Sequence, residues 1–239
     1  MGRRLLSCSV TLFIAFVAFM IVYPVWQIAV YNYYQPDYHC STNLKQIALA
    51  IFMYSGDYDG KLPPATFPGK TVGWANGIQP YIQSFPIFHC PRIAYNEKYS
   101  SPVAEIRESL GLTPDHSQEN PDRPGFTDYW LNGNLSSIKE RQIGDTWKVD
   151  FTNKSGKINY PEQIIMLGDG DGQSPQSTAS YSLNQLPPIW RTSSDSPAKR
   201  HLSGANYAFL DGHVKWLKPN QVSQLPTSKK HPVYTFSVK

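Results

Sequence analysis

Three side chains near the end of the chain have residue types that bind metals. Nine residues separate His201 from Asp211, and His213 follows two positions later. With Asp169 or Asp171 they would make up a zinc-type ligand set of imidazoles and carboxylates. The spacing fixes no geometry, because Asp211 and the glycine after it signal a tight turn. We therefore predict no metal site: Asp211 serves the turn, and His201 hydrogen-bonds to nearby backbone.

The run from Gly168 to Gly172 alternates glycine with aspartate and resembles a fragment of a calcium loop. It lacks the spaced carboxylates and the closing glutamate of helix–loop–helix calcium sites. We expect no cofactor, with calcium as the alternative. The sequence contains no Gly-x-Ser-x-Gly turn, and no cysteine has an evident histidine base. We expect no catalytic residues and no enzyme activity.

Two cysteines, Cys40 and Cys90, follow a long apolar segment and lie at the boundaries of predicted elements. If that segment places them outside the cytoplasm, they meet an oxidising compartment in which disulfides form. A bridge would close a loop of about 50 residues and contribute about 4 kcal/mol in the chain-entropy model. We predict this disulfide; two buried free thiols are the alternative.

The apolar segment runs from Leu5 to Val30 without a charged residue. A bilayer core needs about 20 apolar helical residues, so the segment is long enough to span it. Arg3 and Arg4 precede it, and residues 31–39 lack Lys and Arg, which predicts a cytoplasmic N-terminus. Aromatic side chains that favour the headgroup region gather at its far end. They are Tyr23, Trp26, Tyr31, Tyr33 and Tyr34.

We predict that residues 1–36 form a cytoplasmic basic start and a single transmembrane anchor, and that residues 37–239 form an extracytoplasmic domain. The apolar run is longer than the 7–15 residues typical of a signal-peptide core, which favours retention over cleavage. Pro36 disfavours helix at the residue before it, so we expect the membrane helix to end there. A second helix would then begin in the domain.

The sequence of residues 37–239 predicts an α+β domain in which one amphipathic helix packs on an antiparallel sheet. From Thr42 to Ser55, apolar residues recur at helical spacing and form one stripe. Glu105 to Leu110 is a second, short helix candidate. Asp211 and Gly212 predict a type I′ turn between two strands. The strands expected from β-branched and aromatic content are Gln163–Leu167, Ala205–Leu210, His213–Leu217 and Val233–Val238.

The charge balance argues against nucleic acid as a partner. Without Arg3 and Arg4, 20 of the 22 basic residues remain against 18 acidic ones. Nucleic-acid binding needs clustered Lys and Arg to neutralise phosphates. The local pairs Lys199-Arg200 and Lys229-Lys230 are interpreted as solvated loop charges.

The His201 to Asp211-Gly212 spacing resembles the signature of a large family of bacterial pilin-like proteins, the prepilin-type processing-associated proteins. Cys40 to Ala50, followed by Met53-Tyr54, Asp57, Gly60 and Leu62-Pro63, resembles the amphipathic helix of that family and the loop after it. Weaker matches follow in family order at Trp74, Pro80-Tyr81, Phe88 to Pro91 and Gln163 to Leu167. The resemblance implies a pilin-like head facing the periplasm and an anchor in the bacterial inner membrane.

The chain departs from the pilin pattern at one position that matters for assembly. Pilins carry a glutamate early in the mature membrane helix, whereas no carboxylate occurs here before Asp37. A buried charge of that kind is costly and pairs between neighbouring subunits. We therefore expect a structural or accessory subunit of a membrane complex, whose partners are its other subunits and the lipid bilayer.

Two alternatives remain open. The first is a processed pseudopilin or minor pilin of a type II secretion or type IV pilus-like fibre. The second is a surface module that stacks glycans on Trp74, Trp130, Trp147 and Trp190, although large aromatic side chains are by default part of a core.

Overall fold

The computed structural model describes residues 2–67, 72–82, 84–93, 121–122, 125–135, 138–143, 146–151, 160–172, 175–223 and 233–237. The α-helices are α1 (Gly2–Asp57), α2 (Trp74–Gly77) and α5 (Pro188–Thr192). Short 3₁₀ helices are η1 (Gln79–Tyr81), η2 (Phe85–Phe88), η3 (Gly133–Leu135), η5 (Pro161–Gln163), η6 (Pro197–Lys199) and η7 (Pro219–Gln221). The strands are β1 (Tyr129–Asn132), β2 (Ile138–Ile143), β3 (Thr146–Phe151), β4 (Ile165–Asp169), β5 (Ser182–Leu183), β6 (Ala205–Phe209), β7 (Val214–Leu217), β8 (Val222–Ser223) and β9 (Tyr234–Thr235).

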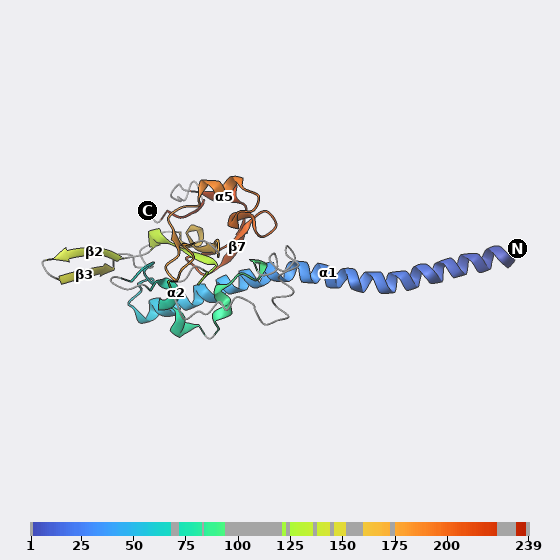
Figure 1. Cartoon of the computed structure of the whole chain (residues 1–239), viewed down its shortest axis with the longest axis horizontal. Coiled ribbons are helices and arrows are strands. Elements are labelled where there is room, and N and C mark those ends of the chain that lie inside the picture. The colour runs from blue at the N-terminus through green and yellow to red at the C-terminus, as the bar shows by residue number, and fades with distance from the viewer. Residues whose placement is uncertain are drawn as a thin grey trace.

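Helix α1 is a single rod of 56 residues, about 84 Å long at the usual helical rise. Its first half projects away from the head and its second half lies within it (Figure 1). The predicted break at Pro36 is wrong, because the helix runs through this residue and through the expected domain boundary. A proline inside a helix costs about 3 kcal/mol. Asp37, the next residue, makes ion pairs with Arg92 and His201 that hold the helix in place.

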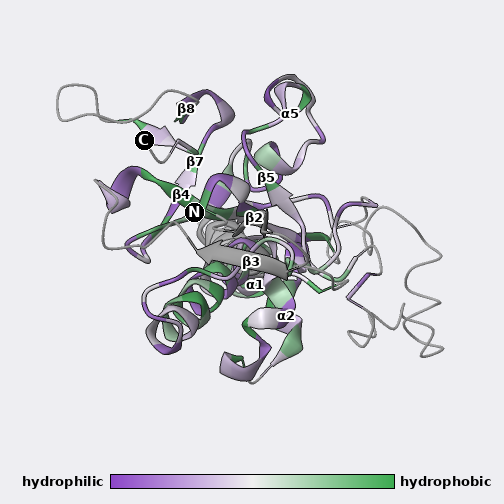
Figure 2. Ribbon diagram, turned by 90° about the vertical axis from the view of Figure 1, so that its left-hand side faces the viewer, coloured by the Kyte–Doolittle hydropathy of each residue, from purple (hydrophilic) through white to green (hydrophobic). Residues whose placement is uncertain are grey.

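The second half of α1 is amphipathic, as the apolar stripe predicts. Leu44, Ile47 and Ile51 are fully buried, whereas Lys45 and Gln46 are exposed. The stripe packs against the sheet through β4, β6 and β7, and Figure 2, which looks along the helix, shows α1 beneath the strands. Burial of this face supplies the main contact between helix and sheet.

The main sheet has five strands in the order β5-β1-β4-β6-β7. Its neighbouring pairs are antiparallel except β1 and β5, which run parallel with Leu131 opposite Ser182. The fold is therefore α+β with a helix on a mixed sheet, and the prediction of a purely antiparallel sheet is wrong. Strand β5 was missed because two residues leave no alternating pattern.

Both faces of the sheet are buried. Along β6, Tyr207 and Phe209 point to one side and Ala208 points to the α1 side. The face away from α1 is covered by a second apolar cluster that includes Leu186 near α5 and Phe236 after β9. Phe236 stacks on Trp130 of β1 with ring centroids 4.9 Å apart. The head is thus layered, with α1 below the sheet and short segments above it.

The predicted hairpin is formed by β6 and β7, but its turn is not type I′. Only Gly212 has a positive φ, at +90°, whereas a type I′ turn needs two such residues. The Gly212 N–H donates to Phe209 O at 2.8 Å, and the Phe209 N–H donates to His213 O at 2.9 Å. The connection is therefore a three-residue loop that ends on a left-handed glycine.

The remaining sequence expectations have mixed outcomes. The strand expected at Val233–Val238 is reduced to β9, which pairs with β8 in a separate two-stranded sheet. The hairpin of β2 and β3 was not expected (Figure 1). The helix candidate Glu105 to Leu110 lies outside the described residues.

Within the part of the chain that the structure describes, none of the helices combines the length and apolar character needed to cross a bilayer. The transmembrane anchor has no support in the structure and stays a sequence-based prediction.

Replacing Gly212 by alanine tests the turn. An added Cβ would lie 2.8 Å from the Phe52 ring of α1, at a φ that L-residues rarely adopt. We expect Gly212→Ala to lower the free energy of unfolding by about 1–2 kcal/mol, measured by urea unfolding of the full chain in detergent. The control is Gly56→Ala, whose Cβ meets nothing within 4 Å in α1 and which should be neutral or stabilising. Equal effects of the two substitutions would refute this account of the turn.

Candidate functional site

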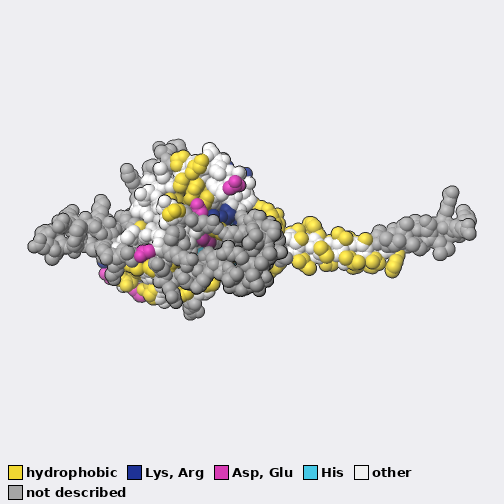
Figure 3. Space-filling model, in the orientation of Figure 1, with side chains coloured by type: hydrophobic (Ala, Val, Ile, Leu, Met, Phe, Trp, Pro, Cys, Tyr) yellow, Lys and Arg dark blue, Asp and Glu magenta, His cyan; other side chains and the backbone are white. Residues whose placement is uncertain are grey.

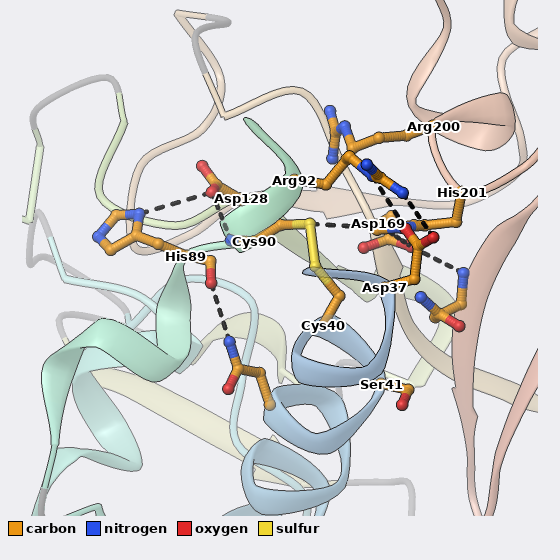
Figure 4. The surroundings of a disulfide bond; sticks show 12 residues. Asp37, Cys40, Ser41, His89, Cys90, Arg92, Asp128, Asp169, Arg200 and His201 are labelled. Carbon is orange, nitrogen blue, oxygen red and sulfur yellow. Dashed lines mark hydrogen bonds and ion pairs between the residues drawn. A yellow bond between two sulfur atoms is a disulfide. The ribbon is translucent and has the colours of Figure 1, made fainter. Parts of the chain in front are cut away.

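A disulfide joins Cys40 of α1 to Cys90, two residues after η2. The predicted pairing is thus present, with a Cα–Cα distance of 5.1 Å. Both cysteines are at most 1% exposed. The bond joins α1 to the segment directly after η2. Charged side chains surround the disulfide (Figure 4).

His201 lies beside this disulfide and contacts carboxylates on two different elements. Its Nδ1 is 2.5 Å from Oδ1 of Asp37 on α1. Its Nε2 is 3.2 Å from Oδ2 of Asp169, the last residue of β4, and 3.4 Å from Sγ of Cys90. Helix, sheet and disulfide therefore meet at one imidazole, which is 1% exposed. We refer to Asp37, Cys40, Cys90, Asp169 and His201 as the buried cluster.

The two carboxylates keep His201 protonated. Burial alone would lower the pKa of the imidazole, but the charges and hydrogen bonds of Asp169 and Asp37 outweigh burial and raise the pKa from 6.5 to about 9. At neutral pH both ring nitrogens therefore carry a proton and donate to a carboxylate. The core holds a positive charge between two negative ones, which is the condition under which a buried charge is tolerated.

Asp37 is shared between His201 and Arg92. The Arg92 guanidinium donates from Nε to Oδ1 at 3.0 Å and from Nη2 to Oδ2 at 2.6 Å, a bidentate geometry. Burial would raise the pKa of the Asp37 carboxyl, but hydrogen bonds from His201 and Arg92 outweigh it and lower the pKa below 3.8. Asp37 thus stays ionised throughout the physiological range.

Asp169 is held by backbone and side-chain donors of the sheet. Its Oδ2 accepts the Asn206 N–H at 2.7 Å, and its carbonyl oxygen accepts from Trp130 Nε1 at 2.9 Å. Nη2 of Arg200 donates to the next carbonyl, that of Gly170, at 2.8 Å. The other carboxylate oxygen, Oδ1, is buried and has no hydrogen-bond partner among the described residues. An unsatisfied buried oxygen of this kind is costly.

A second group of polar side chains fixes the backbone around Cys90. The Cys90 N–H donates to Oδ2 of Asp128 at 2.7 Å. His89 Nδ1 lies 3.6 Å from the same carboxylate oxygen, and Nδ2 of Asn43 on α1 donates to the His89 carbonyl at 2.9 Å. These contacts position Cys90 opposite the helix independently of the disulfide.

The residues that the sequence grouped as a candidate metal site are divided by the fold. Asp211 and His213 pair with each other at the partly exposed hairpin turn, where Asp211 Oδ1 is 2.6 Å from His213 Nδ1 and accepts the His213 N–H at 3.1 Å. Asp211 therefore serves the turn, and Gly212 provides its left-handed residue. His201 and Asp169 are instead in the core, and Asp171 is exposed.

One expectation for His201 is wrong. The backbone of His201 does lock the hairpin, since its carbonyl accepts from Trp216 Nε1 at 2.6 Å, but its imidazole binds carboxylates rather than backbone. A histidine also does lie next to a cysteine sulfur. That sulfur is buried and bonded to Cys40, so the disulfide-bonded protein offers no nucleophile there.

A signal for part of the buried cluster was present in the sequence. Asp37 precedes Cys40 by three residues, and residues three apart on a helix share a face. The expected break at Pro36 concealed this relation, because it left Asp37 outside any helix. The partners from the other elements, Arg92, Asp169 and His201, have no local signal that would link them to α1.

The charge of His201 makes the stability of the protein depend on pH. A histidine whose pKa is raised by folding contributes stability that is complete below its unfolded pKa of 6.5 and is lost as pH rises through about 9. We expect the free energy of unfolding of the full chain in detergent to fall by up to about 3 kcal/mol between these values. His201→Gln cannot titrate, so it should be less stable at pH 6 and lose this slope.

The matched control is His213→Gln, which removes the partly exposed histidine of the hairpin turn and should keep the wild-type slope. Urea unfolding at a series of pH values measures all three proteins. A wild-type stability that is flat between pH 6.5 and 9, or an unchanged slope in His201→Gln, would disprove the charged state assigned to His201.

Comparison with known proteins gives one match. Residues 38–89 match a family described as a protein of unknown function (DUF1559), which is less than a quarter of the 239-residue chain. The matched segment covers the second half of α1 with Cys40 and ends one residue before Cys90. It coincides with the block whose residues resemble the pilin-like helix. No curated protein and no solved structure matches the chain.

Proposed function

We propose that this protein is a non-enzymatic structural or accessory subunit of a bacterial membrane complex. An N-terminal helix that is not cleaved anchors it in the inner membrane, and a pilin-like head faces the periplasm. The observation that carries this proposal is the division of α1 into an apolar projecting half and a half buried in the head (Figures 1 and 3). The match at residues 38–89 is compatible with such a subunit.

The projecting half of α1 carries large apolar side chains that the described head does not cover. Phe16, Phe19, Val22 and Ile28 are each more than half exposed, and hydrophobic side chains line the visible face of the described part of this half (Figure 3). Contiguous apolar surface of this extent marks a site of contact with lipid or protein. The uncharged run from Leu5 to Val30 is long enough for a bilayer.

The aromatic residues expected at the membrane surface lie on α1 toward the end of this apolar half that is nearer the head. All five are more than 40% exposed: Tyr23, Trp26, Tyr31, Tyr33 and Tyr34. Amphipathic rings favour the headgroup region. The Arg92 guanidinium lies 4.9 Å from the centroid of the Tyr33 ring, so the aromatic belt adjoins the buried cluster. The membrane surface would then coincide with the edge of the head.

A continuous helix gives such a subunit a defined geometry. Because α1 passes through Pro36 without a break and is fixed by Asp37 and Cys40, the head is joined to the anchor without a flexible linker. The cluster that fixes it is buried, which suits a structural role better than catalysis. A head held at a fixed height above the membrane suits a subunit that organises partners.

The two alternative functions are less well supported. A processed pseudopilin would pack in a fibre, but no carboxylate precedes Asp37 to pair with a neighbouring subunit. A glycan-binding module would need exposed indole rings, whereas Trp74 and Trp130 are fully buried and Trp190 is partly buried against the second core cluster. The side chain of Trp147 lies outside the described residues.

Membrane insertion tests the proposal. The full chain, produced in bacteria, should remain with the membrane after an alkaline carbonate wash and keep its N-terminal residues in sequencing. Val22→Arg places a charge in the proposed span, which costs roughly 3 kcal/mol and about 100-fold in partitioning. Ile189→Arg is the matched control, because Ile189 on α5 is 65% exposed and Val22 is 63% exposed.

The anchor is supported if the Ile189→Arg variant stays with the membrane after the carbonate wash and the Val22→Arg variant is released. Release of the wild-type chain by carbonate would overturn it. A shortened chain with a methylated first residue would favour the pseudopilin alternative instead.

A further inference from the structure

We infer that the disulfide and a zinc ion are alternative occupants of the buried cluster, so that reduction of Cys40–Cys90 creates a four-ligand zinc site. The donors are Sγ of both cysteines, Nε2 of His201 and a carboxylate oxygen of Asp169. These atoms all lie within 4.8 Å of one another and all four residues are buried. The inference is independent of membrane anchoring.

The present distances already suit a tetrahedral ion. With Zn–S near 2.3 Å and Zn–N or Zn–O near 2.0–2.1 Å, tetrahedral geometry places N and S about 3.5 Å apart and N and O about 3.3 Å apart. His201 Nε2 is 3.4 Å from Cys90 Sγ and 3.2 Å from Asp169 Oδ2. The two sulfur atoms must separate from bonding distance to about 3.8 Å.

The surroundings of His201 are those of a zinc-binding histidine. A ligating imidazole nearly always donates its other ring N–H to a carboxylate, a backbone carbonyl or a water molecule, which fixes the ring and its tautomer. Nδ1 of His201 already faces Asp37 Oδ1 at 2.5 Å, and Arg92 holds that carboxylate from its other side. Asp37 is thus a positioning residue for the proposed site, while Nε2 points at the sulfur (Figure 4).

Asp169 provides a second, independent indication. Its Oδ1 is buried without a hydrogen-bond partner among the described residues, although a buried carboxylate normally has its oxygens satisfied. Oδ2 is already engaged by the Asn206 N–H. A cation held by Oδ2 would lie beside this carboxylate and offset the charge of the oxygen that the disulfide-bonded protein leaves unpaired.

The zinc state is one unit more negative than the disulfide state. In the disulfide state the protonated His201 faces two carboxylates, Asp37 and Asp169, which leaves one negative charge. In the zinc state two thiolates, Asp169 and Asp37 surround one divalent ion and a neutral imidazole, which leaves two negative charges. Arg92 binds Asp37, and Arg200 donates to the carbonyl next to Asp169, so cationic groups border both sides of the cluster.

The conversion balances with a phosphine as reductant. The phosphine gives two electrons to the S–S bond and takes the oxygen of one water molecule, whose two protons pass to the sulfur atoms. Zinc then displaces three protons, one from each thiol and one from Nε2 of His201. Nδ1 keeps its proton for Asp37. Neutral imidazole and thiolates are the ligand forms that zinc requires.

Cobalt binding tests the site, because tetrahedral Co²⁺ absorbs in the visible range and its thiolate ligands add charge-transfer bands in the near ultraviolet. The full chain is studied in detergent with Cys8→Ala, so that Cys40 and Cys90 are its only thiols. After reduction by a phosphine, one equivalent of Co²⁺ should bind with both spectral features. Zn²⁺ should displace it and raise the unfolding midpoint of the reduced chain only.

Substitutions distinguish the four proposed ligands from Asp37, the residue that positions His201. Asp37→Asn retains all four ligands and should keep the thiolate bands while weakening metal affinity by about 10–100-fold. Asp169→Asn and Cys90→Ser should abolish or alter the spectrum. His213→Gln, at the hairpin turn, should bind like the parent protein. Circular dichroism establishes that each variant is folded.

Stoichiometric binding that requires reduction and is weakened by Asp37→Asn supports the site. No binding to the reduced chain, or the same spectrum in Cys90→Ser, would overturn it. Neither result bears on carbonate extraction, so a failure here is distinguishable from a failure of the proposed function.

Discussion

A protonated histidine in a protein core is stable only where negative groups face it, and His201 meets this constraint with carboxylates from two elements. Asp37 comes from α1 and Asp169 from the end of β4. The imidazole therefore joins the long helix to the middle of the sheet. The Cys40–Cys90 disulfide lies against the same ring. Helix position, sheet position and the covalent crosslink are all set at one buried point.

This arrangement explains why α1 passes through a proline. The residue after Pro36, Asp37, makes ion pairs with both Arg92 and His201. Releasing the helix at that point would leave His201 and Arg92 without a shared carboxylate in a buried site, at a cost of several kcal/mol. A proline in a helix interior costs about 3 kcal/mol, which is of the same order, so these contacts can offset it. A rigid connection between the projecting half of α1 and the head follows from this balance.

Local patterns in the sequence predicted the parts of the fold that depend on near neighbours. The apolar stripe with Leu44 and Ile47, the hairpin around Gly212 and strand β4 were all visible as periodicity or turn chemistry. The predicted type I′ turn was wrong, because Asp211 does not adopt a positive φ. A three-residue loop also needs a glycine at its left-handed position, so the Asp-Gly pair did not distinguish the two turns. Apart from the strand expected at Val233–Val238, the expected strand ends differed from the observed ones by at most two residues.

The site depends on contacts between distant residues, and these left little trace in the sequence. Asp37 and His201 are 164 positions apart, and Asp169 lies on a strand whose neighbours include β1, which carried no clear signal. His201 had been grouped with Asp211 and His213 because they are close in sequence. Asp211 and His213 lie at the turn of the β6–β7 hairpin, whereas the imidazole of His201 contacts Asp37 of α1. Of the contacts in the buried cluster, only the disulfide was predicted. Two cysteines at element boundaries in an oxidising compartment were enough to indicate it.

The coupling energy between Asp37 and His201 tests the account most directly. Wild type, Asp37→Asn, His201→Gln and the double variant would be unfolded with urea as full chains in detergent at pH 6, where His201 is charged. If the pair pins α1 to the sheet, the cycle should give a favourable coupling of about 1–3 kcal/mol. Additive effects, with a coupling of zero within error, would contradict the claim that this pair holds the fold together.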